Sequence, residues 1–199
     1  IRRPPRSTRK ESSAASDVYK RQTLNIPYSL HINAIGIKNV IEPTIRKSKI
    51  NTLQANINNI ISAGGLAQIN HPNFRWALTG DDLVKIRGAH FIEIFNGNFD
   101  SHNNGGGGKK GVEEMWDQML TNKIKIWGVA VDDSHHFKEE FRPTRMNPGR
   151  GWIEVFAKNL SSSSILKSLR NGDFYFSTGI KFKSIAYDIN EIKIKNPVT

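Results

Sequence analysis

The chain has 199 residues, of which 37% are hydrophobic, so it is long and apolar enough for one globular domain. It contains no cysteine, which excludes disulfides, thiolate nucleophiles and cysteine-ligated zinc. Residues 1–22 hold seven Lys and Arg against two Asp and Glu and contribute +5 to the net charge of +11, which leaves 22 against 16, or +6, for a mildly basic remainder. No apolar run approaches the roughly 18 residues of a membrane span, so we expect no contact with a membrane.

Residues 1–22 have no helical or strand periodicity and a composition unlike the rest of the chain. The stretch resembles translated sequencing-adaptor sequence, and the alternative is a native, basic, disordered tail. In either case we exclude it from the fold. If it is adaptor sequence, the natural segment upstream of Thr23 is missing and the chain begins within its domain.

Short apolar runs alternate with helical patterns along the rest of the chain. We expect strands at 31–37, 66–70, 90–95, 123–131, 152–157 and 174–177, and helices at 52–63, 79–88, 112–122 and 162–170. Strands that alternate with helices indicate parallel βα units and an α/β fold. The periodicity leaves an open sheet and a barrel both possible. No Gly-x-Gly-x-x-Gly follows an early strand, and ligand-type residues at several strand ends favour the barrel.

The helix expected at 52–63 carries an apolar stripe. Leu53, Ile57, Ile60 and Ile61 recur at helical spacing, and Gly64 follows the stripe as a helix-ending signal. We therefore expect this helix to pack its stripe against the sheet.

Two of the expected strands end in ligand-type side chains. The run 128–131 leads into Asp133-x-His135, and the run 66–70 leads into His71. Pro72 disfavours helix at His71 and predicts an extended backbone there. In extended backbone Asp133 and His135 would face the same side and hold one ion or two adjacent ions. Imidazole and carboxylate ligands suit zinc, manganese or iron, which activate water for hydrolysis.

Each of these sites also has an ordinary explanation. His71 before Pro72 could be a loop histidine, and the run 132–136 could be a turn or a helix start. His31 alone would be a surface residue, and we expect His90 and His102 to be structural. The two strand-end sites together favour a metal centre.

Six different short motifs follow one another between residues 30 and 179. They are His31-Ile32-Asn33-Ala34-Ile35-Gly36, Asn70-His71-Pro72, Glu93-Ile94-Phe95-Asn96-Gly97, Trp116-Asp117-Gln118-Met119-Leu120, Asp132-Asp133-Ser134-His135-His136 and the run 169–179. Each is weak alone, but together they resemble motifs of the polymerase and histidinol phosphatase (PHP) superfamily of metal-dependent phosphoesterases, especially its stand-alone bacterial members.

The resemblance implies a partial, distorted (β/α)7 TIM-like barrel over residues 23–180, with up to three divalent ions (Zn, Mn or Fe) at the carboxyl ends of the strands. By motif, the metal ligands would be His31, His71, Asp133 and His135. Asp132 and His136 would orient these ligands, and Glu93 would be a buried strand residue near the site and not a ligand.

The family's opening His-x-His and further ligands belong upstream of His31, where this chain has only the tail. We therefore expect about half of the ligands to be absent and the chain itself to be nearly inactive. The alternating pattern in 181–199 indicates the start of a truncated C-terminal β segment.

The leading functional hypothesis is a metal-dependent hydrolase of phosphoesters acting on a small phosphorylated substrate. Candidate substrate-binding residues are Arg75, Asn96, Lys109 and Arg150. The alternative is a non-catalytic PHP-like module that binds nucleic acid or has a regulatory role, as the pI of about 10.0 would allow. Hydrolysis of another ester or an amide at a similar metal site is a third possibility.

Overall fold

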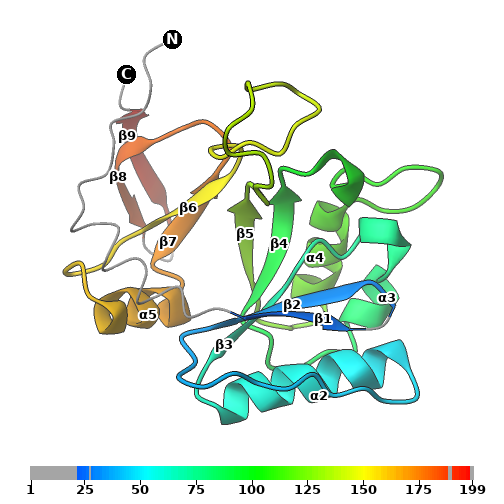
Figure 1. Ribbon diagram of the computed structural model, residues 1–199. Coiled ribbons are helices and arrows are strands. Elements are labelled where there is room, and N and C mark those ends of the chain that lie inside the picture. The colour runs from blue at the N-terminus through cyan, green and yellow to red at the C-terminus, as the bar shows by residue number, and fades with distance from the viewer. Residues whose placement is uncertain (1–21, 27, 188–189, 198–199) are drawn as a thin grey trace.

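The main sheet has five strands. The computed structural model describes residues 22–26, 28–187 and 190–197, so residues 1–21 of the tail predicted at 1–22 lie outside the described residues. The strands are adjacent in chain order: β1 (Gln22–Ile26), β2 (Leu30–Ile35), β3 (Leu66–Ile69), β4 (Phe91–Asn96) and β5 (Trp127–Val131). Gln22, which the sequence analysis excluded from the fold, is the first residue of β1 (Figure 1).

The sheet is mixed. β3, β4 and β5 run parallel, as predicted, whereas β2 is antiparallel to β3 and β1 is antiparallel to β2. The expectation that all strands form parallel units is therefore wrong for β2. Because of this reversal, the start of β2 lies beside the end of β3.

The helix between β2 and β3 is α2 (Lys49–Ser62), which begins earlier than predicted. Ser48 caps it, because its Oγ accepts a hydrogen bond from the Asn51 N–H at 3.2 Å. Three residues of the predicted stripe, Leu53, Ile57 and Ile60, are fully buried, whereas Ile61 is 40% exposed and does not belong to it.

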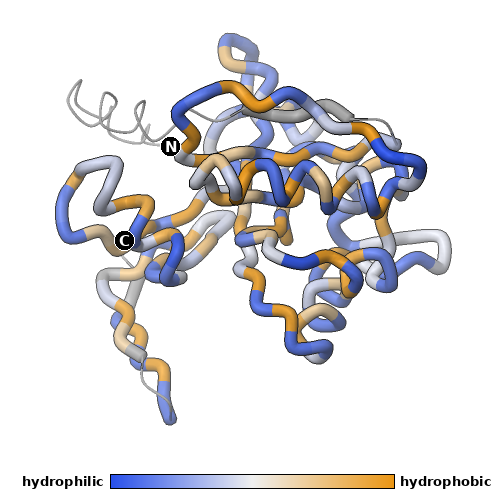
Figure 2. The backbone as a smooth tube through the Cα atoms, turned by 90° about the horizontal axis from the view of Figure 1, so that it is seen from below, coloured by the Kyte–Doolittle hydropathy of each residue, from blue (hydrophilic) through white to orange (hydrophobic). Residues whose placement is uncertain are grey.

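Two helices follow on the same side of the sheet. α3 (Gly80–Leu83) is much shorter than predicted, and Lys49 on α2 forms a 2.6 Å ion pair with its Asp82. α4 (Val112–Thr121) matches its prediction closely and buries Met115 and Met119. Figure 2 shows apolar and polar residues alternating along the helices, as expected of helices with one buried face.

Each face of the sheet has its own core. The α2, α3 and α4 side packs Ile32, Ala34, Ala67, Ile69 and Ile92 of the strands. The other face packs Leu66, Phe91 and Val129 against Leu169 and its neighbours. Side chains alternate between faces along a strand, so the polar residues Asn33, Gln68 and Glu93 share this second face.

Three further elements cover the second face. β6 (Trp152–Val155) and β7 (Phe174–Ser177) form a separate antiparallel pair, and α5 (Ser162–Asn171) lies between them in sequence. α5 ends at Gly172 with φ of +83°, where an added Cβ would come within 2.3 Å of the Trp127 ring, so glycine is required there.

The described strands do not close into a barrel. They form the five-stranded sheet, the β6–β7 pair and an antiparallel pair of β8 (Phe182–Tyr187) and β9 (Ile192–Pro197), so the class is α/β with an open sheet. Two short 3₁₀ turns, η1 (Phe74–Trp76) and η2 (Phe99–Ser101), follow β3 and β4. In the part of the chain that the structure describes, no helix is long and apolar enough to cross a membrane.

Candidate metal centre

The antiparallel ladder between β2 and β3 brings two histidines together. Ile32 pairs with Ile69, and the Asn70 N–H donates to the His31 carbonyl at 3.1 Å. His31 Nδ1 and His71 Nε2 are 3.0 Å apart, and their rings meet edge to face with centroids 4.8 Å apart. These imidazoles are distant in sequence, so the direction of β2 produces the contact.

His71 does not have the extended backbone predicted from Pro72. Its φ is +23°, in the left-handed region that only glycine adopts readily. Its backbone N–H donates to Glu93 Oε2 at 2.8 Å, a charge-assisted hydrogen bond when Glu93 is ionised. A tertiary contact has therefore overridden the local preference.

Glu93 is the acceptor at the centre of a polar cluster. Besides the His71 N–H, it accepts hydrogen bonds from Asn96 Nδ2 at 3.0 Å and Gln68 Nε2 at 2.9 Å. Only 3% of Glu93 is exposed. Burial raises the pKa of Glu93 to about 7, which the hydrogen bonds from Asn96 and the His71 N–H oppose, while the Asp133 charge adds to the rise.

The β5 side of the site is a loop. Asp133 has φ of +47°, so the expectation that Asp133 and His135 project from extended backbone is wrong. His135 Nδ1 donates a hydrogen bond to the Asp133 carbonyl oxygen at 2.6 Å, so in the neutral ring Nε2 is the nitrogen with a lone pair. The His135 and His136 N–H groups both donate to the Met146 carbonyl, at 2.9 and 3.0 Å.

Asp132 and His136 both form hydrogen bonds within the loop. Asp132 Oδ2 accepts from the Gly149 N–H at 2.9 Å, and His136 Nδ1 accepts from the Met146 N–H at 3.2 Å. Both side chains therefore hold the returning part of the loop, and their role in orienting the ligands stays a prediction.

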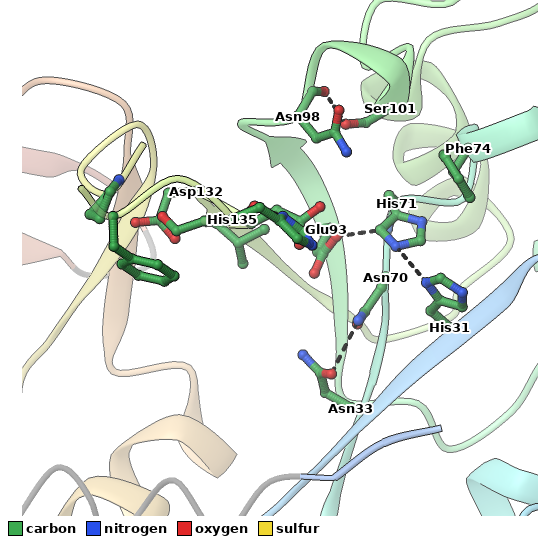
Figure 3. Close-up of a pocket in the computed structure, with 15 residues that line it drawn as sticks. His31, Asn33, Asn70, His71, Phe74, Glu93, Asn98, Ser101, Asp132 and His135 are labelled. Carbon is green, nitrogen blue, oxygen red and sulfur yellow. Dashed lines mark hydrogen bonds and ion pairs between the residues drawn. The ribbon is translucent and has the colours of Figure 1, made fainter. Parts of the chain in front are cut away.

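One cavity of about 670 Å³ joins the two sides. Its walls are mostly polar and include all four predicted metal ligands. The lining residues are His31, Asn33, Asn70, His71, Phe74, Glu93, Asn98, Ser101, Val131, Asp132, Asp133, Ser134, His135, Phe137 and Pro148. Figure 3 shows His31 and His71 on one side of Glu93, with Asp132 and His135 on the other.

The four predicted ligands face this cavity as two pairs. His31 contacts His71, and His135 Nδ1 lies 4.0 Å from Asp133 Oδ1. Within residues 22–26, 28–187 and 190–197, no three His, Asp or Glu side chains gather closely enough to hold one metal ion.

Burial favours the neutral form of both histidines. Burial lowers the pKa of His31, with a smaller lowering by Arg75, and burial followed by His31 lowers the pKa of His71. The Asp133 carboxylate acts in the opposite direction on both rings, so its charge reaches them across the cavity. Neutral imidazole is the form that binds metals.

The predicted substrate-binding residues lie in different places, and none lines the cavity. The Arg75 guanidinium lies 5.3 Å from the centre of the Phe74 ring, which contacts both imidazoles. Asn96 is buried and its amide oxygen accepts from the Asn98 N–H. Lys109 lies 4.4 Å over the Trp76 ring, and Arg150 lies 4.6 Å over the Phe141 ring.

Sequence reasoning located Glu93 near the site but missed its contact with His71. A carboxylate inside the apolar run of 91–95 was the available signal, because an unpaired carboxylate is costly to bury. It missed Asn33, Asn70 and Ser101 as lining residues as well, since amide and hydroxyl side chains are common on any strand or loop.

Comparison with known proteins finds similarity to solved structures. No protein-family model matches the chain, and no curated protein matches it. The chain is similar to the crystal structure of a two-domain protein from Bacteroides vulgatus that contains a predicted PHP-like metal-dependent phosphoesterase, at 16% identity and a TM-score of 0.47. The similarity covers 85% of this chain and 49% of that one, so the chain spans about half the length of that protein.

Proposed function

We propose that this chain contributes to the active site of a metal-dependent hydrolase that cleaves phosphoester bonds in small substrates. The observation that carries the proposal is the 3.0 Å separation of His31 Nδ1 and His71 Nε2 in a cavity that Asp133 and His135 also line. We further propose that the open sheet corresponds to part of a PHP-type barrel, on the motif resemblance.

The histidine pair suits a shared divalent cation. Two nitrogens that each lie ~2.0–2.1 Å from one zinc ion at nearly a right angle are about 3 Å apart, which matches the separation here. Among the described residues His71 Nδ1 is buried without a hydrogen-bond partner, so the contact of Nε2 with His31 is the one hydrogen bond of this ring. When bound, a divalent ion would supply a Lewis acid for the phosphoryl group and activate water.

The residues of the chain would divide the remaining work. His31 and His71 offer neutral nitrogens, and Asp133 offers negative charge that acts on both. His135 offers its free Nε2 from the opposite wall. Arg75 beside Phe74 could receive an anionic substrate, because a guanidinium binds phosphate oxygens in a bidentate manner.

Backbone strain at His71 and Asp133 supports a functional role for these two residues. His71 and Asp133, one on each side of the cavity, both have positive φ and are not glycine. Such conformations cost of order 1–3 kcal/mol each and are found preferentially at ligand and active sites.

Metal titration tests the proposal. Zn²⁺, Mn²⁺ and Fe²⁺ are added separately to metal-free protein in a calorimeter, and hydrolysis of p-nitrophenyl phosphate is followed with each ion. We expect saturable binding of at least one ion, lost in His31→Ala. We expect only slow hydrolysis, because about half of the ligands are expected to be absent, and a further fall of its rate in Arg75→Ala. Wild-type protein that binds none of the three ions would refute the metal centre. Binding with cleavage of carboxylic esters but not of phosphoesters would refute the substrate class.

A further inference from the structure

Glu93 is a carboxylate in the middle of an apolar strand. Its neighbours on β4 are mostly buried and apolar, and only 3% of Glu93 itself is exposed. A buried carboxylate is unfavourable unless several donors surround it, and here three donors do so. Those donors come from β3, β4 and the backbone that follows β3, which puts Glu93 at the junction of these segments.

The contact with His71 is the one that reaches the site. Glu93 Oε2 accepts the His71 N–H at 2.8 Å, and His71 holds its strained φ of +23° at that point. We propose that Glu93 is a positioning residue that holds His71 in this left-handed backbone conformation and thereby keeps its imidazole against His31. As a role in metal binding, this inference rests on the proposed function.

The same cluster extends to the strand that carries His31. Gln68 Nε2 donates both to Glu93 Oε1 at 2.9 Å and to Asn70 Oδ1 at 3.2 Å. Asn70 Nδ2 then donates to Asn33 Oδ1 on β2 at 3.1 Å. Figure 3 shows the contact of Glu93 with His71 and that of Asn70 with Asn33, without Gln68. Glu93 therefore connects to both histidine-bearing segments.

The hydrogen bonds favour positioning over direct metal binding by Glu93. Oε2 already accepts two hydrogen bonds and Oε1 accepts one, so three of about four acceptor sites of the carboxylate are occupied. The carboxylate would have to release donors that are themselves buried in order to bind an ion.

The first test uses metal-free protein and NMR. Nuclear Overhauser contacts between the His31 and His71 ring protons are compared in wild type, Glu93→Gln and Glu93→Ala. We expect the contacts in wild type and their loss in Glu93→Ala, because no acceptor then holds the His71 N–H. Glu93→Gln keeps one oxygen and should keep weakened contacts.

The second test measures zinc affinity by competition with a chelating dye. We expect Glu93→Gln to weaken zinc binding about 10-fold, the lower end of what loss of a ligand-orienting contact costs. The double variant Glu93→Gln/Gln68→Glu exchanges the amide and the carboxylate across their 2.9 Å contact and should recover part of the affinity. If Glu93 only stabilised the fold, the double variant would not recover zinc affinity unless it also recovered thermal stability.

Asn56→Asp is the matched control. Asn56 is fully buried in α2, and its amide donates to the carbonyls of Thr44 and Thr52, away from the cavity. This variant should lower the melting temperature and leave zinc affinity unchanged.

The outcomes separate the two ideas. Ring contacts and zinc affinity that both survive in Glu93→Ala would overturn the positioning role. If wild type binds none of Zn²⁺, Mn²⁺ and Fe²⁺ but its ring contacts depend on Glu93, the proposed function fails and the positioning role stands. If Glu93→Ala does not fold, Glu93→Gln and the exchanged pair decide, and a pair that recovers nothing counts against the inference.

Discussion

The two walls of the cavity are built differently. On the β2–β4 wall, His71 and Glu93 are buried, and hydrogen bonds connect them to three strands. On the β5 wall, Asp133 and His135 lie in a loop, with side chains 31% and 58% exposed, and their hydrogen bonds stay within residues 132–149. The first wall is arranged by the fold, and the second by its own loop.

This difference suggests an order of events for a ligand. A preformed pair of imidazoles binds an ion without loss of side-chain freedom, whereas a loop has to give up conformational entropy when it joins. We therefore expect the strand wall to dominate affinity and the loop wall to respond to the ion.

The largest effect expected from this comparison is the loss of His71. His71→Ala should weaken zinc binding about 100-fold or more, since four ligands together supply ~10–16 kcal/mol in structural zinc sites. Asp133→Asn should weaken zinc binding only about 10-fold, because the entropy lost when the loop becomes ordered offsets part of what its ligands contribute. Calorimetric titration of both variants measures the ratio.

His102→Ala is the control for this pair. His102 is exposed and stacks on Trp76, with ring centroids 4.5 Å apart, so its removal should leave zinc affinity unchanged. A greater loss in Asp133→Asn than in His71→Ala would reverse the assignment of the two walls.

The burial of Glu93 predicts a pH dependence of stability. Its pKa is about 7 in the folded protein and near 4.5 otherwise, so the folded state binds more protons between these values. The contribution of Glu93 to stability is therefore complete below about pH 4.5 and is lost as the pH rises to about 7. The free energy of unfolding of wild type minus that of Glu93→Gln should fall by up to ~1.4 kcal/mol per pH unit across this window.

Urea denaturation of both proteins in the presence of a chelator gives this difference. His31 and His71 affect both proteins alike, and their lowered pKa values act in the opposite direction, since they remove stability as the pH falls below about 6.5. A difference that does not change with pH would mean that Glu93 keeps its ordinary pKa.

Gly97 follows β4 and contacts the end of β5, so it lies where the two walls meet. Its N–H donates to the Val131 carbonyl at 2.9 Å, and an added Cβ would lie 2.7 Å from the Asp132 carbonyl oxygen. Gly97→Ala should therefore push the β5 loop away and lower stability by ~1–3 kcal/mol, with a loss of several-fold in zinc affinity. Thermal unfolding and calorimetry check these effects. Gly179→Ala is the control for space, because a Cβ there meets no neighbour within 4 Å and the backbone, like that of Gly97, does not have a positive φ.

The smallest expected effect is a change in hydrogen exchange on zinc addition. Amides of residues 132–148 should exchange several-fold more slowly with zinc, and amides of β3 and β4 should change little, because those strands are already ordered. Mass spectrometry of peptides from both walls reports the difference. Equal protection of the two walls would show that the strand wall is not preformed.

The sequence predicted the strand ends better than the paths between them. The apolar runs before His71 and Asp133 placed both residues at one rim, because successive parallel strands end on the same side. The reversal of β2 was beyond that reasoning, since alternation of strands and helices carries no information on the direction of a first strand. His31 reaches the site only because of that reversal.

Backbone conformation at the site was predicted least well. Pro72 and the run before Asp133 both indicated extended backbone, and both residues have positive φ instead. Local rules describe a residue and its neighbours in sequence, whereas His71 receives its conformation from Glu93 on another strand. The predicted end of the helix at Gly88 was also wrong, since α3 ends at Leu83.

The register between β2 and β3 determines where residues can be inserted near His31. His31 meets His71 through strand register, with Asn33 opposite Gln68, and a slip of one residue would turn His31 to the face covered by α2. In the connection from Gly36 to Ser48, residues 38–40 are exposed, whereas Ile37 is buried in the core and Thr44 hydrogen-bonds to Asn56 of α2. Insertions should therefore be tolerated at residues 38–40, while a single inserted residue within β2 should separate the two imidazoles.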